Sequence, residues 1–348
     1  MQHSPPPLRT TTTPLRTARP ASRRLPVLLV LAVVAAFSVS AWLGFNAADG
    51  GAPNLAASKV CAAHACQDVQ VDVRAAAGGG ARIECAYCNQ DPNRWRALTS
   101  TPPPELGGKS AAVIEGACGS LLYGFNENER RPPASLTKIV AAMVAVDRAK
   151  LTDVVEVRIN GWELSAEDNS TIMGLETGMR LPVRDLLYGM LLASGNDAAL
   201  ALADHLGDTT KFVNLMNAKV RDLGLANTNF VTPDGRDAPG HYSSAFDMAF
   251  LGRALLQNPT LKTIVNTRSY QPHWDGPEIK NNNEMIYAYS DAIGIKTGYT
   301  ETADFTIVTA MEREGRLLVV STFGGWHLYL DAVNLLNWAF ANTRSACP

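Results

Sequence analysis

A long uncharged segment near the N-terminus limits where the rest of the chain can fold. Residues 25–45, LPVLLVLAVVAAFSVSAWLGF, contain no charged side chain. As a helix this segment is about 31 Å long, enough to cross the hydrocarbon core of a bilayer. We therefore interpret residues 25–46 as an uncleaved transmembrane signal-anchor. A cleaved signal peptide is the closest alternative, because SVSA at 38–41 offers small residues at a plausible cleavage spacing.

The charges around this segment indicate its orientation. Residues 1–24 hold five arginines and no acidic residue, and positive charges beside an apolar span stay in the cytoplasm. This predicts a disordered, cytoplasmic basic tail over residues 1–24, single-pass attachment to the cell membrane and an extracytoplasmic body after it. The formal net charge of the whole chain is −2, which gives no indication of a nucleic-acid partner.

The next segment, residues 47–105, is rich in Ala, Gly and Pro and has the composition of a linker. It contains four of the six cysteines, namely Cys61, Cys66, Cys85 and Cys88. Outside the cell we expect disulfides, because a short segment without a core needs covalent cross-links. A zinc site is the alternative, since C-x4-C and C-x2-C are also metal-ligand spacings. The other two cysteines, Cys118 and Cys347, could pair if the two ends of the body meet.

From about residue 106 the pattern becomes that of a packed domain, which we expect to span residues 106–346. Two apolar runs, Ala111–Ile114 and Leu121–Phe125, flank Gly-Ala-Cys-Gly and predict a β-hairpin. Residues 291–323 predict three more strands, and residues 330–341 a closing helix. Strands at both ends with helices between them predict an α/β protein of the α+β type. Its antiparallel sheet would be flanked by helices and carry an inserted all-helical subdomain.

The helical part of the pattern has clear start and stop signals. The stretch VRDLLYGMLLASGNDAALALADHLG predicts two helices that are broken at Ser194-Gly195. A later helix would be capped by Ser243 or Ser244 and stopped by Pro259.

A further helix is predicted from Leu136 to about Lys150. A serine and a lysine near its start have the spacing of a nucleophile and its base. In PPASLTKIV, Ser135 and Lys138 are three positions apart, so they share one face of a helix. Burial there would lower the pKa of the lysine and allow a neutral amine to take the serine proton. The alternative is an N-cap serine followed by a solvated lysine, because about one S-x-x-K occurs by chance in such a chain.

Two other short stretches add polar groups to this picture. Ser194-Gly195-Asn196 interrupts an apolar pattern and would present a hydroxyl and an amide, although a simple break between helices is the more usual explanation when this stretch is taken alone. Lys296-Thr297-Gly298 follows an apolar strand and would place a cation at its edge. Taken alone, it is typical of an ordinary strand end.

In this order, S-x-x-K, S-x-N and K-T-G resemble the motif set of penicillin-binding proteins and class A β-lactamases. Longer stretches, such as RRPPASLTKIVAAMVAV and GIKTGYTETADFTIVTA, extend the likeness. About residues 109–341 resemble the serine-type D-Ala-D-Ala carboxypeptidases, the low-molecular-mass penicillin-binding proteins. The resemblance implies a β-lactamase/transpeptidase-like fold, a peptidoglycan pentapeptide or cross-linked peptide as substrate, and inhibition by β-lactams. It implies neither a metal nor an organic cofactor.

The resemblance also implies the catalytic residues. Ser135 would attack the carbonyl of the terminal D-Ala-D-Ala bond and become acylated, with Lys138 as its base. Ser194 and Asn196 would orient the lysine and the substrate amide, and Ser194 could relay a proton to the leaving amine.

Four consecutive residues would bind the substrate. By the same resemblance, Lys296 would supply positive potential for the terminal carboxylate and Thr297 would hydrogen-bond it. Gly298 completes that motif. The backbone N–H groups of Ser135 and Tyr299 would bind the oxyanion.

One departure from the family pattern concerns the carboxylate. Family members often carry an arginine after the last strands, whereas STFGGWHLYLDA has Trp326 and His327 there. This leaves D,D-endopeptidase action on cross-links as an alternative to carboxypeptidase action.

Two further alternatives fit the sequence less well. A class A β-lactamase needs a deacylating glutamate, but residues 197–295 contain only Glu278 and Glu284, neither in a suitable setting. A catalytically inactive cell-wall-binding module would have no chemical need for intact Ser135, Lys138 and Lys296 together.

Overall fold

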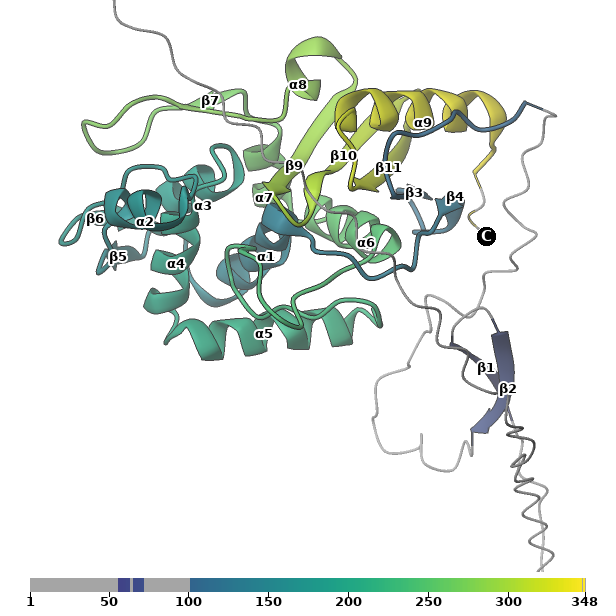
Figure 1. Ribbon diagram of the computed structural model, residues 1–348, viewed down its shortest axis with the longest axis horizontal. Coiled ribbons are helices and arrows are strands. Elements are labelled where there is room, and N and C mark those ends of the chain that lie inside the picture. Colours follow the sequence, from purple (N-terminus) through teal and green to yellow (C-terminus); the bar gives the residue numbers. More distant parts are fainter. Residues whose placement is uncertain (1–55, 63–64, 72–100, 346, 348) are drawn as a thin grey trace, which may run out of the picture. The chain divides into compact units, whose positions relative to one another are not determined.

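The computed structural model describes residues 56–62, 65–71, 101–345 and 347 (Figure 1). The predicted basic tail and the predicted signal-anchor lie outside the described residues. Within the described part, every helix is too short or too polar to span a bilayer.

Part of the cysteine-containing segment is described as a hairpin. Strands β1 (Ala56–Ala62) and β2 (Ala65–Val71) pair antiparallel, and their register places Cys61 opposite Cys66. Cys85 and Cys88 lie outside the described residues. The choice between disulfides and zinc for these four cysteines therefore stays a prediction.

A five-stranded antiparallel sheet forms the frame of the body, in the order β4-β3-β11-β10-β9. Its strands are β3 (Ser110–Glu115), β4 (Leu121–Phe125), β9 (Ala292–Thr300), β10 (Asp304–Arg313) and β11 (Arg316–Phe323). The first and last parts of the body meet where β3 pairs with β11. This confirms the predicted antiparallel sheet with neighbouring terminal strands.

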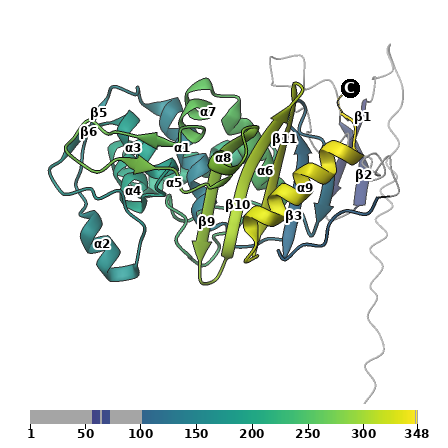
Figure 2. The same ribbon diagram turned by 90° about the horizontal axis from the view of Figure 1, so that it is seen from above.

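Helices cover both faces of this sheet (Figure 2). On opposite faces lie α6 (Ala245–Leu256) and α9 (Leu328–Asn342). Three helices contact its β9 edge, namely α1 (Lys138–Arg148), α7 (Pro259–Val265) and α8 (Met285–Ala288). The others pack mainly against helices beside the sheet: α2 (Gly161–Asp168), α3 (Val183–Leu191), α4 (Asn196–His205) and α5 (Thr209–Asp222). Short elements complete the set: the 3-10 turn η2 (Ala134–Thr137), β5 (Val154–Glu156), β6 (Arg180–Pro182), β7 (Ser269–Tyr270) and β8 (Ile279–Lys280).

The core lies on both sides of the sheet. Successive side chains of a strand point to opposite faces, so Ala112 and Ile114 pack toward the α1 and α6 side while Ala111 and Val113 pack toward α9. All four are fully buried. Burial on both faces explains why these strands are continuous apolar runs in the sequence, without polar alternation.

The helix signals operate largely as the sequence predicts. The Ser244 side chain caps α6 by accepting a hydrogen bond from the backbone N–H of Asp247, and α6 ends at Leu256. Pro259 follows the end of α6, as expected for a helix stop, and it is also the first residue of α7. Proline is favourable there, since the first N–H groups of a helix have no partner within it.

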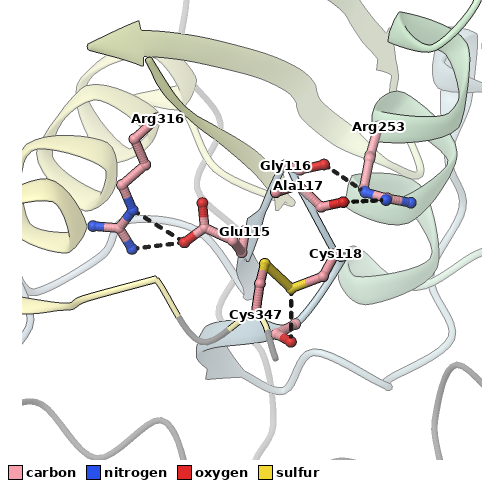
Figure 3. The surroundings of a disulfide bond; sticks show 8 residues. Glu115, Gly116, Ala117, Cys118, Arg253, Arg316 and Cys347 are labelled. Atoms are coloured by element: carbon pink, nitrogen blue, oxygen red, sulfur yellow. Dashed lines mark hydrogen bonds and ion pairs between the residues drawn. A yellow bond between two sulfur atoms is a disulfide. The ribbon is translucent and has the colours of Figure 1, made fainter. Parts of the chain in front are cut away.

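The end of the chain is tied to the β3–β4 turn. Cys118 and Cys347 form a disulfide with their Cα atoms 5.6 Å apart (Figure 3). This is the pairing that the sequence left open. The bond closes a long loop, because the two cysteines are separated by 229 positions.

Two arginines reinforce this junction, one on each side of the disulfide (Figure 3). Arg253 of α6 donates to the carbonyls of Gly116 and Ala117, both at 2.7 Å. Arg316 of β11 forms an ion pair with the buried carboxylate of Glu115 at 2.8 Å. The turn, α6 and the last strand are therefore joined by polar contacts as well as by the disulfide.

We predict that Cys118→Ser and Cys347→Ser each lower the free energy of unfolding by about 2–4 kcal/mol, because the unfolded chain gains the freedom that the cross-link removes. Urea denaturation of the full chain measures the change. The double variant serves as the control. It should be no less stable than either single variant, because all three lack the same bond, and wild-type stability in the single variants would contradict the prediction.

Candidate active site

The serine and lysine of S-x-x-K lie together at the start of α1. Ser135 belongs to the turn η2 and is partly exposed, whereas Lys138 is 0% exposed. The Lys138 Nζ atom is 2.8 Å from Ser135 Oγ. Neither half of the simpler interpretation holds, because the residue at the N-cap of α1 is Thr137 and the lysine is not solvated.

Three oxygen atoms surround the Lys138 amine. Besides Ser135 Oγ, Nζ donates to Asn196 Oδ1 at 2.7 Å and to the main-chain oxygen of Asp234 at 2.6 Å. Burial lowers the pKa of Lys138 to about 8, and the charges of Asp234 and Asp197 offset part of that effect. At neutral pH a usable fraction of this lysine is therefore a neutral amine beside a hydroxyl.

The break between α3 and α4 carries the second motif. Ser194 has a φ of +67°. A residue other than glycine keeps this left-handed conformation only where the surrounding structure holds it. Asn196 is the first residue of α4, and its Nδ2 donates to Ser170 Oγ at 2.8 Å while its Oδ1 faces Lys138. The predicted turn is real, and it presents both polar side chains to the same place.

The third motif lies on β9, the edge strand of the sheet. Lys296 is 1% exposed, and its Nζ donates to Ser194 Oγ at 3.0 Å and to the carbonyl of Thr297 at 2.6 Å. Both acceptors are uncharged. Burial first, and then the charge of Lys138, hold the pKa of Lys296 well below its usual range. A second buried amine therefore stands beside the site without a carboxylate among these contacts.

The strand passes very close to the serine. A Cβ atom at Gly298 would lie 2.8 Å from the backbone nitrogen of Ser135, a distance that excludes any side chain. Thr297 is partly exposed, and Tyr299 is 49% exposed with its ring packed against Phe305. The structure thus brings all eight residues singled out from the sequence into one region.

One supporting residue escaped the sequence analysis although it directly follows the second motif. Asp197 is fully buried. Its carboxylate accepts backbone N–H groups of Met173, Gly174, Leu175 and Ala198 at 2.9 Å. These bonds hold residues 170–175 against α4, and so place Ser170 beside Asn196. The only sequence signal was an acidic residue at the start of a predicted helix.

A second supporting element is the loop over residues 231–241. Its Asp234 carbonyl accepts a hydrogen bond from Lys138. The guanidinium of Arg236 forms ion pairs with the carboxylates of Asp234 at 2.7 Å and Asp168 at 2.9 Å, and so links them. Gly235 lies against the turn that carries Ser135: a Cβ there would be 2.0 Å from the Ala134 oxygen. Turn-forming residues predict a loop at PDG, but they do not predict what that loop touches.

The arrangement suits nucleophilic chemistry. The partly exposed hydroxyl of Ser135 faces the buried amine of Lys138, whose pKa is lowered. A second buried amine, that of Lys296, contacts the hydroxyl of Ser194. In the described part of the chain, no cluster of three or more His, Cys, Asp or Glu side chains is suited to a metal ion.

Comparison with known proteins identifies the family of this chain. The family model for D-alanyl-D-alanine carboxypeptidase matches residues 97–325. The chain belongs to this family. Among its relatives, the carboxypeptidase DacB2 of Mycobacterium tuberculosis is 37% identical over 252 residues, covering 70% of this chain and 85% of that protein. DacF of Bacillus subtilis is 34% identical over 251 residues, covering 69% of this chain and 61% of that protein.

A solved structure shows the same architecture. The D-alanyl-D-alanine carboxypeptidase from Mycobacterium tuberculosis superposes with a TM-score of 0.66 at 35% identity, covering 72% of this chain and 99% of that one. The predicted β-lactamase/transpeptidase-like fold is therefore confirmed. The chain spans about three-fifths of the length of several curated relatives that it matches.

We predict that Gly235→Ala destabilises the protein far more than Gly178→Ala. Both glycines have a φ of +91°, but only at Gly235 would the new Cβ meet neighbouring backbone. The shared strain costs about 1–2 kcal/mol, so the excess measures the clash with the Ala134 carbonyl. Thermal unfolding of both variants tests this, and equal melting temperatures would show that the loop does not press on the Ser135 turn.

Proposed function

We propose that this protein is a membrane-anchored serine D-alanyl-D-alanine carboxypeptidase that trims peptidoglycan stem peptides through an acyl-enzyme on Ser135. The observation that carries the proposal is the buried Lys138 amine 2.8 Å from the Ser135 hydroxyl. Membership of the D-alanyl-D-alanine carboxypeptidase family supports it.

Acylation begins with a proton transfer. Neutral Lys138 accepts the proton of Ser135, and the Oγ atom attacks the carbonyl carbon of the terminal D-Ala-D-Ala bond. The bond to the last alanine breaks, and its amine leaves with the proton from Lys138, directly or through Ser194. Asn196 holds the Lys138 amine in line, since its Oδ1 accepts one N–H at 2.7 Å.

The oxyanion of this step needs donors that are already in place. In our proposal the backbone N–H groups of Ser135 and Tyr299 supply them. The close approach of Gly298 to the Ser135 nitrogen supports this assignment, because it brings the two backbone segments together. Loss of one such donor typically slows catalysis about 100- to 1,000-fold.

Substrate selection rests on charge. The terminal carboxylate of the stem peptide would approach Lys296 and the hydroxyl of Thr297. Lys296 is buried and contacts two uncharged oxygens, surroundings that lower its pKa. The negative charge of an arriving carboxylate would favour the protonated amine, and the resulting ion pair would be strong in this poorly solvated setting. A β-lactam carries an equivalent carboxylate beside a reactive amide, which makes it the expected inhibitor.

Deacylation completes the cycle. Water attacks the ester on Ser135 while Lys138 takes a proton from that water. Lys138 then returns the proton to Ser135 Oγ as the ester bond breaks, and the shortened peptide leaves with a new carboxylate. The proposed chemistry requires neither a metal nor an organic cofactor.

The proposed location follows from the sequence. The uncharged segment 25–45 and the arginines before it support a single-pass anchor with the catalytic part outside the cytoplasm. Peptidoglycan peptides are found on that side of the membrane. Protease treatment of intact spheroplasts tests the topology, because the body should be degraded while the tail is protected.

We predict that the detergent-solubilised full chain releases one D-alanine from pentapeptide muropeptides and that Ser135→Ala does not. Mass spectrometry of the products shows the loss of a single alanine. Labelling with a fluorescent penicillin is the parallel measurement, and Ser135→Ala should abolish it. An unchanged pentapeptide with wild-type protein would contradict the carboxypeptidase assignment.

The same assay separates the endopeptidase alternative, which the exposed Trp326, standing where family members often carry an arginine, leaves open. Cross-linked dimers split into monomers, with pentapeptides left intact, would identify that activity.

We predict that the rate of penicillin acylation rises with pH and levels off above about pH 8. The pKa of Lys138 is about 8, and only the neutral amine can accept the proton, so the rate rises about tenfold per pH unit well below that value. Lys138→Arg is the matched control, because arginine stays charged and should be inactive across the range. A flat profile between pH 6 and 9 would exclude this base.

A further inference from the structure

Ala134, the residue before Ser135, has a strained backbone conformation that neighbouring groups must stabilise. Ala134 has a φ of +50°, a left-handed conformation that costs a non-glycine residue about 1–2 kcal/mol. Its carbonyl oxygen accepts a hydrogen bond from Thr137 Oγ1 at 2.9 Å. Thr306 Oγ1 donates to the preceding carbonyl, that of Pro133, at 3.2 Å. The two peptide groups before the serine are therefore both held by threonine hydroxyls.

A buried histidine stands behind the first of these threonines. His241 is 6% exposed, and its Nε2 lies 2.9 Å from Thr137 Oγ1. Its Nδ1 accepts the backbone N–H groups of Val231 at 2.9 Å and Thr232 at 3.2 Å. A ring nitrogen that accepts hydrogen bonds carries no proton, so the proton of the neutral ring is on Nε2.

This tautomer sets the direction of the whole chain of bonds. The Nε2–H of His241 donates to Thr137 Oγ1, and the hydroxyl proton of Thr137 is then directed to the Ala134 oxygen. Burial lowers the pKa of His241 to about 4, against the charges of Asp234 and Asp237. The ring is therefore neutral at neutral pH, as the two backbone donors at Nδ1 require.

Peptide geometry carries the effect to Ser135. The carbonyl of Ala134 and the N–H of Ser135 belong to one rigid planar group, and in a trans peptide they point in opposite directions. The described chain contains no cis peptide bond. A fixed direction for the Ala134 oxygen therefore fixes the direction of the Ser135 N–H, which lies against Gly298.

We propose that His241 is a positioning residue: through the Thr137 hydroxyl it aims the Ser135 N–H at the oxyanion. The inference rests on the proposed acylation of Ser135 and adds a residue from the loop over 231–241 to that reaction. His241 acts only through Thr137 and does not touch the substrate. Its loss should slow the formation of the oxyanion while leaving substrate binding at Lys296 intact.

The test compares variants that remove the relay with variants that keep it. Thr137→Val removes the hydroxyl at nearly constant volume, and His241→Leu removes both ring contacts. Thr137→Ser keeps the hydroxyl, and the amide of His241→Gln can both accept from the backbone and donate to Thr137. Thr309→Val is the matched control, because it deletes another buried threonine hydroxyl that bonds a carbonyl, that of Ile293 at 3.2 Å.

We expect Thr137→Val and His241→Leu to lower kcat on a D-Ala-D-Ala peptide and the penicillin acylation rate about tenfold, since small misplacements of catalytic groups carry such penalties. KM should stay within about twofold, because the proposed carboxylate contacts are untouched. Thr137→Ser, His241→Gln and Thr309→Val should stay close to wild type. Melting temperatures of the full chain are recorded for every variant.

Two outcomes overturn the inference. One is wild-type kcat in Thr137→Val, and the other is an equal loss in Thr309→Val, which would show general destabilisation. If His241→Leu does not fold, the Thr137→Val and Thr137→Ser pair decides. Ser135→Ala keeps the underlying function separate: continued labelling of that variant would reject acylation at Ser135, whereas lost labelling with an unaffected Thr137→Val rejects only the role of His241.

Discussion

The removal of one lysine from water is the constraint on which the site depends. Lys138 is completely buried, and a buried amine without partners would be too costly to keep. Three segments that are distant in sequence each supply one oxygen acceptor, through Ser135, Asn196 and the carbonyl of Asp234. The same contacts that make the lysine tolerable in the core also aim it at the serine, so stability and chemistry are linked at this point.

Backbone strain accompanies this arrangement. Ala134 and Ser194 both have positive φ values, and each stands at or beside a hydroxyl of the site. Such residues cost about 1–3 kcal/mol each and persist only where surrounding packing forces them. Here the packing comes from rigid neighbours: Gly298 on β9 lies against the Ser135 nitrogen, and Gly235 lies against the Ala134 carbonyl. Neither position has room for a larger residue.

Much of the frame could be predicted because it depends on local pattern. The hairpin β3–β4, the three strands β9 to β11 and the break at Ser194 follow from apolar runs and turn residues, as found. The short helix α2 and the strand pairs β5–β6 and β7–β8 were not predicted, since two- and three-residue strands carry no periodicity. Pro259 marked a helix end correctly, but its role as the start of α7 depends on Asn258 capping that helix.

The sequence alone determined that Ser135 and Lys138 share a helical face, because a three-residue spacing is a local property of the helix. It also determined a segment apolar enough to cross a membrane. Only the tertiary structure decided that Lys138 is buried and that Lys296 reaches Ser194 from 102 positions away. It also decided that the Asp234 carbonyl and His241 support the site. Main-chain acceptors have no signature in a sequence, and a histidine in a loop acquires its partner only when the sheet and helices bring that loop against the serine.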